Sequence, residues 1–168
     1  MNKQSLFFTC IVAIASLIIM FFLINLFYKK RFQVKEETPI SNTYLVWIGS
    51  LLGTFFLLLK VALEQIENTI EIVIYSPTIN NTFFVVMQKI FIFTGFTYFF
   101  SFLLYFIVDF TISLTNGMKK EQIEMEQNNT NYFLLKAFLM LALAYSLLDV
   151  FEHFLKWFIP VIDTPFYH

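Results

Sequence analysis

The sequence predicts an all-α membrane protein in which four transmembrane helices form one bundle. The first observation behind this prediction is composition: 58% of the 168 residues are hydrophobic and 14% are charged, and the mean hydropathy is +0.71. Soluble domains are nearer to about 45–50% apolar and about 25% charged. The second observation is that the apolar residues gather in four stretches, each at least as long as the roughly 20 residues that span a bilayer core.

The four stretches are residues 6–28, 44–64, 90–115 and 132–159. The first carries no charged residue and runs on into a basic end, so we interpret it as a retained span and not as a cleaved signal peptide. Spans of this length must be helices, because lipid offers no partner for open backbone groups. We therefore expect the whole chain, residues 1–168, to form a single transmembrane domain.

Capping and turn residues mark the ends of these spans. The third span ends at Asn116-Gly117, which is a turn signal. Side chains that satisfy the free amides of a helix start are Ser41, Asn42 and Thr43 before the second span and Asn129, Thr130 and Asn131 before the fourth.

The segment between the second and third spans, residues 65–89, allows two interpretations. Residues 69–75 and 82–87 are rich in β-branched and aromatic side chains, with turn-forming residues between them. This pattern is typical of a β-hairpin, which would lie on the membrane surface. Alternatively, the second helix continues and carries three glutamates on one face. Both alternatives stay open at the level of sequence.

The basic residues predict the orientation in the membrane. They are Lys29, Lys30, Arg31 and Lys35 in the link 29–43, and Lys119 and Lys120 in the link 117–131, whereas residues 64–82 carry no basic residue. By the positive-inside rule, both links lie in the cytoplasm and both termini lie outside. We expect a multi-pass protein of the bacterial inner membrane.

Charged residues near the outer ends of the second and fourth spans are expected to pair. Lys60 and Asp149 lie at matching heights along their spans, and a charge inside the bilayer is costly unless it finds a partner. The predicted intramembrane cluster consists of Lys60, Glu64, Asp149, Glu152, His153 and Lys156. An offset of 89 residues aligns the two spans, which indicates either a parallel two-helix repeat or a coincidence between two Leu- and Phe-rich helices.

A second ion pair is expected at the inner end of the bundle. Asp109 lies near the inner end of the third span and Lys136 near the inner start of the fourth, at about the same level. Asp109 also ends a polar stripe of the third span at helical spacing, whose other members are Thr94, Tyr98, Ser101 and Tyr105.

The second span contains a candidate packing motif. Gly49 and Gly53 form a GxxxG, which allows a neighbouring helix to come close. The two glycines share a helix face with Lys60 and Glu64, which favours that face as a contact surface.

The sequence predicts no catalytic residue, no cofactor and no metal site. Asp149, Glu152 and His153 do not follow the spacing of zinc-binding helical motifs, and one His with carboxylates is a weak ligand set. Cys10 is the one cysteine, which excludes an intrachain disulfide framework and Cys-rich zinc sites. We therefore expect a non-enzymatic role.

The expected partners are the lipid bilayer, further copies of this chain and a cytosolic protein, with no direct contact to nucleic acid. In the predicted topology only the two links face the cytoplasm, so the docking candidates are Lys29, Lys30, Arg31, Lys119, Lys120, Glu121, Glu124 and Glu126. One alternative is a small ion channel or transporter that uses the polar stripes of spans two to four. Another is an accessory subunit of a larger membrane complex.

In size, four-span architecture and its excess of residues with AT-rich codons (Phe, Ile, Asn, Lys and Tyr), the chain resembles the small membrane subunits of bacterial antiphage defence systems of the Kiwa type. The resemblance covers the whole chain but rests on architecture and not on a motif, so it assigns no residue roles. It implies a membrane subunit that acts in antiviral defence by recruiting a cytosolic partner or sensing membrane perturbation.

Overall fold

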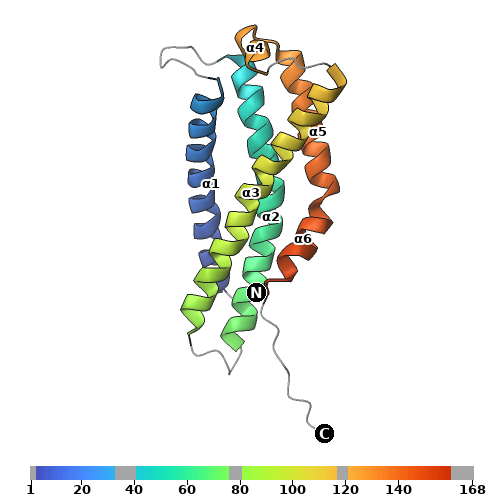
Figure 1. Cartoon of the computed structure of the whole chain (residues 1–168). Helices are drawn as coiled ribbons and strands as arrows, with labels where there is room; N and C mark the ends of the chain where they lie inside the picture. Colours follow the sequence, from blue (N-terminus) through green and yellow to red (C-terminus); the bar gives the residue numbers. More distant parts are fainter. Residues whose placement is uncertain (1–2, 33–40, 76–80, 117–120, 160–168) are drawn as a thin grey trace.

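The computed structural model of the chain is a bundle of helices, described for residues 3–32, 41–75, 81–116 and 121–159. No strand occurs in these ranges. The helices are α1 (Lys3–Phe32), α2 (Asn42–Tyr75), α3 (Thr82–Asn116), α4 (Glu121–Glu126), α5 (Thr130–Ser146) and α6 (Leu148–Lys156) (Figure 1). The short α4 lies at one end of the bundle, which we name the α4 end, and we name the opposite end the far end.

The lengths and compositions of the helices are those of a multi-pass membrane protein. Within the described residues, α1, α2 and α3 are each long and apolar enough to cross a bilayer. The pair α5 and α6 passes the same test only when both helices are taken together, and they are bent by 47° at the break between them. The described chain therefore contains three candidate spans, or four if this bent pair is one span.

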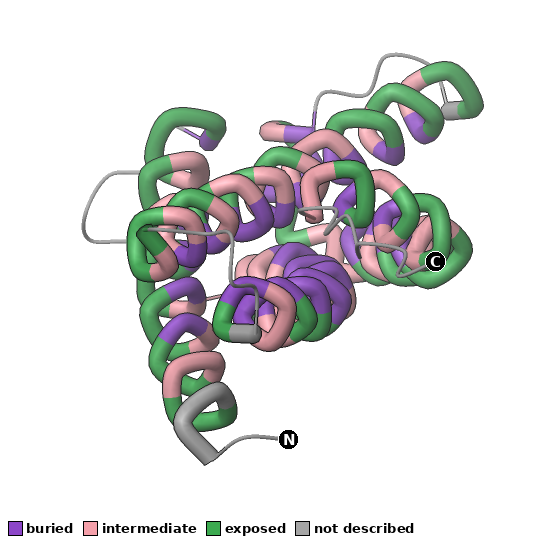
Figure 2. Tube along the Cα trace, turned by 90° about the horizontal axis from the view of Figure 1, so that it is seen from below, coloured by how far each residue is buried: buried purple, intermediate pink, exposed green. Residues whose placement is uncertain are grey.

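Helix α2 is the most buried of the three long helices and α1 the least. Half of the most apolar part of α2 is buried inside the bundle, against 17% for α1. In Figure 2 the buried positions lie on the sides of the helices that face one another. The large side chains on the outside of α1 include Phe7, Ile18 and Phe22, which are 71%, 64% and 63% exposed. Such a face suits contact with lipid.

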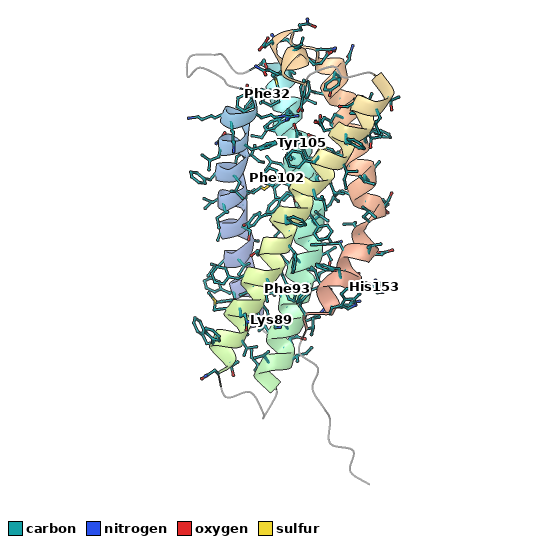
Figure 3. The ribbon with its side chains drawn as sticks, in the orientation of Figure 1. Phe32, Lys89, Phe93, Phe102, Tyr105 and His153 are labelled. Atoms are coloured by element: carbon teal, nitrogen blue, oxygen red, sulfur yellow. The ribbon has the colours of Figure 1, made fainter. Side chains whose placement is uncertain are left out.

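The charges of α3 lie about one hydrocarbon thickness apart. Lys89 precedes Asp109 by 20 residues, and no charged residue stands between them. At about 1.5 Å per residue this is about 30 Å of helix, which equals the thickness of a typical hydrocarbon core, about 30 Å. Asp109 accepts a hydrogen bond from Lys136, which also donates to Glu121 of α4, so it lies at the α4 end. Lys89 lies toward the far end (Figure 3), and the two levels mark the two boundaries of the apolar part.

Of residues 65–89, the described parts 65–75 and 81–89 extend the helices and contain no strand. Helix α2 runs on to Tyr75 and α3 begins at Thr82. Ile66, Ile70 and Val73 of α2 are buried in the same core as Val86 and Ile90 of α3. Apolar residues at spacings of three and four form one stripe of a helix, and this stripe decides between the two interpretations.

The chain bends between α5 and α6 at Leu147, whose ψ is 4°. The Ser146 hydroxyl donates to the carbonyl of Ala142 at 2.8 Å, but Thr94 and Ser101 make the same bond within the continuous helix α3, so this bond alone does not account for the bend. The position that corresponds to Leu147 in the proposed repeat is Leu58, where α2 is continuous. The two-helix repeat is therefore not confirmed.

Two of the predicted helix caps are confirmed. The Ser41 hydroxyl accepts a hydrogen bond from the amide of Tyr44 at 3.1 Å. The Asn129 side chain accepts one from the amide of Tyr132 at 3.3 Å. Each bond satisfies an amide that has no partner within its own helix, so the sequence fixes where α2 and α5 begin.

The two glycines of the GxxxG behave differently. A Cβ atom added at Gly53 would lie 2.9 Å from Cδ2 of Leu141 on α5, whereas one added at Gly49 would have no neighbour within 4 Å. Gly53 is therefore a point of close approach between α2 and α5. The prediction of a packing role was wrong for Gly49, because that position is exposed and no helix packs against it.

We expect Gly53→Leu to lower the stability of the folded bundle by about 1–3 kcal/mol, the usual cost of overpacking. A larger side chain at this position meets Leu141 and separates α2 from α5. Gly49→Leu is the matched control and should change stability little, because its side chain projects into open space. The measurement is the midpoint of unfolding of the detergent-solubilised protein. Equal loss in both variants would contradict this packing arrangement.

Candidate functional site

The most unusual residue of the bundle is a lysine buried at the α4 end. Lys136 of α5 is 1% exposed, and its Nζ lies 2.7 Å from Oδ1 of Asp109 and 2.7 Å from Oε1 of Glu121. The same ammonium lies over the ring of Tyr105, 3.8 Å from its centroid. A buried ammonium is tolerated only with such partners. The predicted pair of Asp109 and Lys136 is thereby confirmed.

An arginine from α1 joins the same group. Nη2 of Arg31 lies 3.0 Å from Oδ2 of Asp109, and its Nε lies 3.3 Å from Oε2 of Glu121. The Arg31 side chain is 39% exposed, whereas that of Glu121 is 2% exposed. Arg31 thus covers the buried carboxylates from the outside and connects them to the last turn of α1.

Glu121 is the acceptor on which these bonds converge. Its Oε2 accepts from the hydroxyl of Tyr105 as well as from Arg31, and its Oε1 accepts from Lys136. We name Arg31, Tyr105, Asp109, Glu121 and Lys136 the ionic network. Two cations face two carboxylates, so the network is neutral as a whole, and it joins α1, α3, α4 and α5. Tyr105 marks its position near the α4 end in Figure 3.

Aromatic rings separate the network from the apolar interior. Tyr105 is fully buried, and the ring of Phe27 meets it edge-on at 5.3 Å between centroids. Trp47, 1% exposed, packs against both rings at 6.1 and 6.2 Å. Rings at these distances and angles attract one another. They also exclude water from the side of the network that faces the bundle.

The link between α3 and α5 folds back onto the bundle and holds Glu121 in place. Met125 of α4 is buried in the core. The turn that follows α4 contains Asn128, whose φ of 51° is a left-handed conformation that asparagine tolerates well. The amide of Asn129 then bonds the carbonyl of Glu124 at 3.0 Å. The described part of this link is therefore packed against the bundle.

The docking residues predicted on the links divide into three groups. Glu121 and Glu124 are each 4% exposed, and Glu124 accepts a hydrogen bond from the side chain of Asn129. These two glutamates serve internal contacts, so the prediction that they form a docking surface was wrong. The candidates that are exposed are Lys29, Lys30, Arg31 and Glu126, although Arg31 also belongs to the ionic network. Lys119 and Lys120 lie outside the described residues.

The charge cluster predicted at the far end does not assemble. Lys60 pairs with Glu64 on its own helix at 4.0 Å, and Lys156 pairs with Glu152 at 2.6 Å. His153 bonds the backbone carbonyl of Asp149 one turn earlier, at 2.7 Å. The described residues contain no ion pair between Lys60 and Asp149.

The side of α2 on which Lys60 lies explains this outcome. Helix α6 packs its Phe151 and Leu155 into the core that contains Leu58 and Ala62 of α2. Lys60 lies between these two positions in sequence but on another side of the helix, beside Leu17 of α1. Matching heights along two helices therefore did not bring their charges together.

The polar stripe of α3 is satisfied within the bundle. The hydroxyls of Thr94 and Ser101 donate to the carbonyls of their own helix one turn earlier, at 2.7 Å each. The hydroxyl of Tyr98 donates to the carbonyl of Ser16 on α1 at 3.1 Å. Hydroxyls bonded in this way have little need of water, and the stripe serves helix packing.

Among the described residues, no group of three or more His, Cys, Asp and Glu side chains is arranged to hold a metal ion. The chain matches no protein-family model, no curated protein and no solved structure. The functional interpretation therefore depends on the geometry of the chain alone.

Sequence reasoning missed Arg31 and Glu121 as members of the ionic network. The number of charges at the α4 end could have identified both residues. Arg31 and Lys136 lie at the level of Asp109, so a neutral buried group requires one more carboxylate, and Glu121 is the nearest one in the following link. Tyr105 stands one turn before Asp109 in the polar stripe, so the sequence correctly predicted that both residues lie on the same face of α3.

We expect Lys136→Met to destabilise the bundle by about 3 kcal/mol, because removing one partner of a buried ion pair leaves the other charge uncompensated. Adding Glu121→Gln to Lys136→Met should recover part of this loss, since it removes one of the two carboxylates that then face Arg31 alone. Lys60→Met is the control and should cost less than about 1 kcal/mol, as expected for an exposed pair. Unfolding curves in mixed detergent measure all three. A double variant as unstable as the sum of its single variants would refute the network.

Proposed function

We propose that this chain is a non-enzymatic membrane subunit that reports a disturbance of the bilayer to a protein at the α4 end of the bundle. The ionic network is the observation that carries this proposal. It connects the most lipid-exposed helix, α1, to the short helix α4 through Arg31 and Glu121. A change in the position of α1 thereby changes how strongly α4 is bound to the bundle.

The coupling follows from the way α1 meets lipid and protein. A helix whose apolar length does not match the bilayer responds by tilting, and α1 exposes most of its surface to lipid. A tilt that withdraws Arg31 removes one donor from Glu121 and one from Asp109. Glu121 then keeps Lys136 and Tyr105 as donors, so α4 is held less strongly and its release becomes easier.

We propose four spans, with α5 and α6 together as the fourth, and a cytoplasmic position for the α4 end. Lys29, Lys30 and Arg31 in the last turn of α1 support this orientation, because basic residues favour the cytoplasmic side. Both termini then lie outside the cytoplasm of a bacterial cell, with the protein in the inner membrane.

The surface offered to a cytosolic partner is the outer face of α4 and the end of α1. Ile123 of α4 is 47% exposed. Glu126, three residues later, is also exposed, as is Lys30 in the last turn of α1. Release of α4 would add Met125, which is buried in the intact bundle. An apolar centre with charges at its rim is the usual composition of a binding surface.

The exposed charges of α2 support a homo-oligomer. The side chain of Lys60 is 79% exposed, and it stands four residues before the predicted outer end of its span. A charge that faces lipid inside the membrane is costly, and the bond to Glu64 is long, at 4.0 Å. A second copy that covers this face would remove the charges from lipid.

A channel is less well supported, because the apolar part of the bundle is filled. Phe55, Phe93 and Met20 have no exposed surface, and the hydroxyls of α3 donate to carbonyls. A conducting pore would need a continuous polar route. A role in antiviral defence is the part of the proposal that comes from the resemblance to antiphage membrane subunits.

The orientation is tested with single cysteines in a Cys10→Ser background. We expect Glu126→Cys to be protected from a membrane-impermeant thiol reagent in intact cells, and Asn81→Cys to react. Both positions are exposed in the folded chain, so protection reports the side of the membrane and not burial. Labelling of Glu126→Cys in intact cells, with protection of Asn81→Cys, would reverse the topology.

The reporting role is tested by loosening α4. A hydrogen bond to a charged group contributes about 1.5–3 kcal/mol, so Glu121→Gln should raise the released population of α4 at least about tenfold. We expect a correspondingly larger amount of a soluble protein to co-purify from native cells in mild detergent. Glu64→Gln, at the far end, is the control and should leave this amount unchanged.

The same experiment separates the alternatives. Recovery of no soluble protein with either variant would contradict the reporting role, and single-channel currents from the purified chain in planar bilayers would then support the channel. Recovery of other membrane proteins in fixed proportion would support an accessory subunit of a larger complex.

A further inference from the structure

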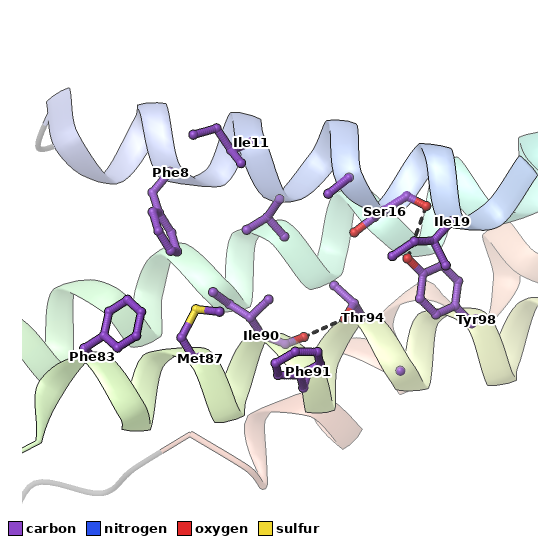
Figure 4. Close-up of a pocket in the computed structure, with 13 residues that line it drawn as sticks. Phe8, Ile11, Ser16, Ile19, Phe83, Met87, Ile90, Phe91, Thr94 and Tyr98 are labelled. Atoms are coloured by element: carbon purple, nitrogen blue, oxygen red, sulfur yellow. Dashed lines mark hydrogen bonds between the residues drawn. The ribbon is translucent and has the colours of Figure 1, made fainter. Parts of the chain in front are cut away.

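A groove of about 520 Å³ opens between α1 and α3 in the half of the bundle toward the far end. Figure 4 shows its walls, which include Phe8, Ile11 and Ile19 from α1 and Met87, Phe91 and Tyr98 from α3. The lining is almost entirely apolar. The hydroxyl of Thr94 in this wall donates to the carbonyl of Ile90, so it does not require a polar ligand.

The groove is closed at one end and open at the other. Toward the α4 end, the ring of Phe27 packs between α1 and α3 against Phe102 and Phe106, at 5.3 and 5.8 Å. Tyr98 is the lining residue of α3 nearest to these rings along the chain, and its hydroxyl donates to the carbonyl of Ser16. Gly95 leaves room in the same wall, because a Cβ atom at this position would have no neighbour within 4 Å.

The closed end lies near the middle of the bilayer. Ile19 precedes Arg31 by 12 residues, and Tyr98 precedes Asp109 by 11, so the closed end stands about 16–18 Å from the ionic network. Half of a hydrocarbon core is about 15 Å. The open end, at Phe8 and Phe83, lies beyond the level of Lys89, at the far boundary of the apolar part. The groove therefore spans one leaflet.

We propose that this groove binds one acyl chain of a lipid from the leaflet at the far end, with the chain terminus beside Tyr98. The depth decides between occupants. A transmembrane helix of a partner or of a second copy would continue across the bilayer, where Phe27 and its aromatic neighbours close the way. An acyl chain ends at the midplane, as the groove does.

The size and chemistry of the groove fit this occupant. Binding sites for small molecules usually measure about 300–1,000 Å³ and have mainly apolar walls. The lipid site goes beyond the proposed reporting role, and it would stand if no cytosolic partner existed, because it lies at the opposite end of α1 from the ionic network.

The test fills the groove from one wall and uses a lipid probe. Gly95→Phe projects a ring into the groove, while Gly49→Phe places the same side chain on α2, outside the lining of this groove, at a position where a Cβ atom also has no neighbour within 4 Å. Each protein is reconstituted into vesicles of phosphatidylethanolamine and phosphatidylglycerol that contain a phospholipid with a photoreactive diazirine at the end of one acyl chain. After irradiation, mass spectrometry of peptides locates the label.

We expect the native chain to be labelled mainly within residues 15–19 and 91–98. Gly95→Phe should lower this labelling at least about tenfold, the loss expected when about two methylene groups can no longer be buried, and Gly49→Phe should leave it unchanged. Ala15→Phe fills the groove from the α1 wall and serves as a second variant if Gly95→Phe does not fold, as judged by its elution and helix content.

Three outcomes would overturn the lipid site. One is labelling of the groove no stronger than that of Tyr145, which is 72% exposed on α5 and lies at a similar depth, nine residues beyond Lys136; this result would mean general contact with lipid. Another is labelling that survives in both groove-filling variants. The third is a cross-link between the groove walls of two copies, which would assign the groove to an interface of this chain.

Discussion

The structure depends on the burial of one ammonium group, that of Lys136. Helices in lipid gain little from burying apolar side chains against one another, because the surrounding acyl chains are equally apolar. Packing and polar contacts must then set the height and rotation of each helix. Lys136 requires carboxylates within bonding distance, and it obtains them from α3 and α4. Those carboxylates are in turn shared with Arg31 of α1.

This requirement also explains why a six-residue helix persists between two spans. An isolated α4 is too short to be stable, since helix formation in water is unfavourable for short segments. Glu121 at its start and Met125 near its end are both buried, so the bundle supplies what the local sequence lacks. The α4 helix is a consequence of the ionic network and not an independent element.

The sequence predicted the helical class, two helix starts and the pair of Asp109 and Lys136 because each depends on position along the chain. The cap of a helix, its length and the height of a residue along it all follow from residue numbers alone. The failed pairing of Lys60 with Asp149 shows the limit of this reasoning. Successive residues of a helix turn by about 100°, so equal height does not fix which side faces the partner.

Two other features depended on information outside each element. Whether residues 65–89 form strands or helices was decided by Ile70 and Val86, which bury one another across the α2 and α3 ends. The break at Leu147 has no Gly or Pro beside it, so the sequence contains no strong helix breaker that predicts it. Glu121 was overlooked because a glutamate in a charged link is usually hydrated, and its buried position depends on three other helices.

The exact balance of charge in the ionic network has an electrical consequence. A charge that moves across a membrane potential does work of about 2.3 kcal/mol per elementary charge per 100 mV. Arg31 and Lys136 cancel Asp109 and Glu121, so a joint displacement of the four groups transports no net charge. The network as a unit is therefore indifferent to voltage. A displacement of Arg31 alone, away from Asp109 and Glu121, would by contrast carry one positive charge and would do work against the membrane potential.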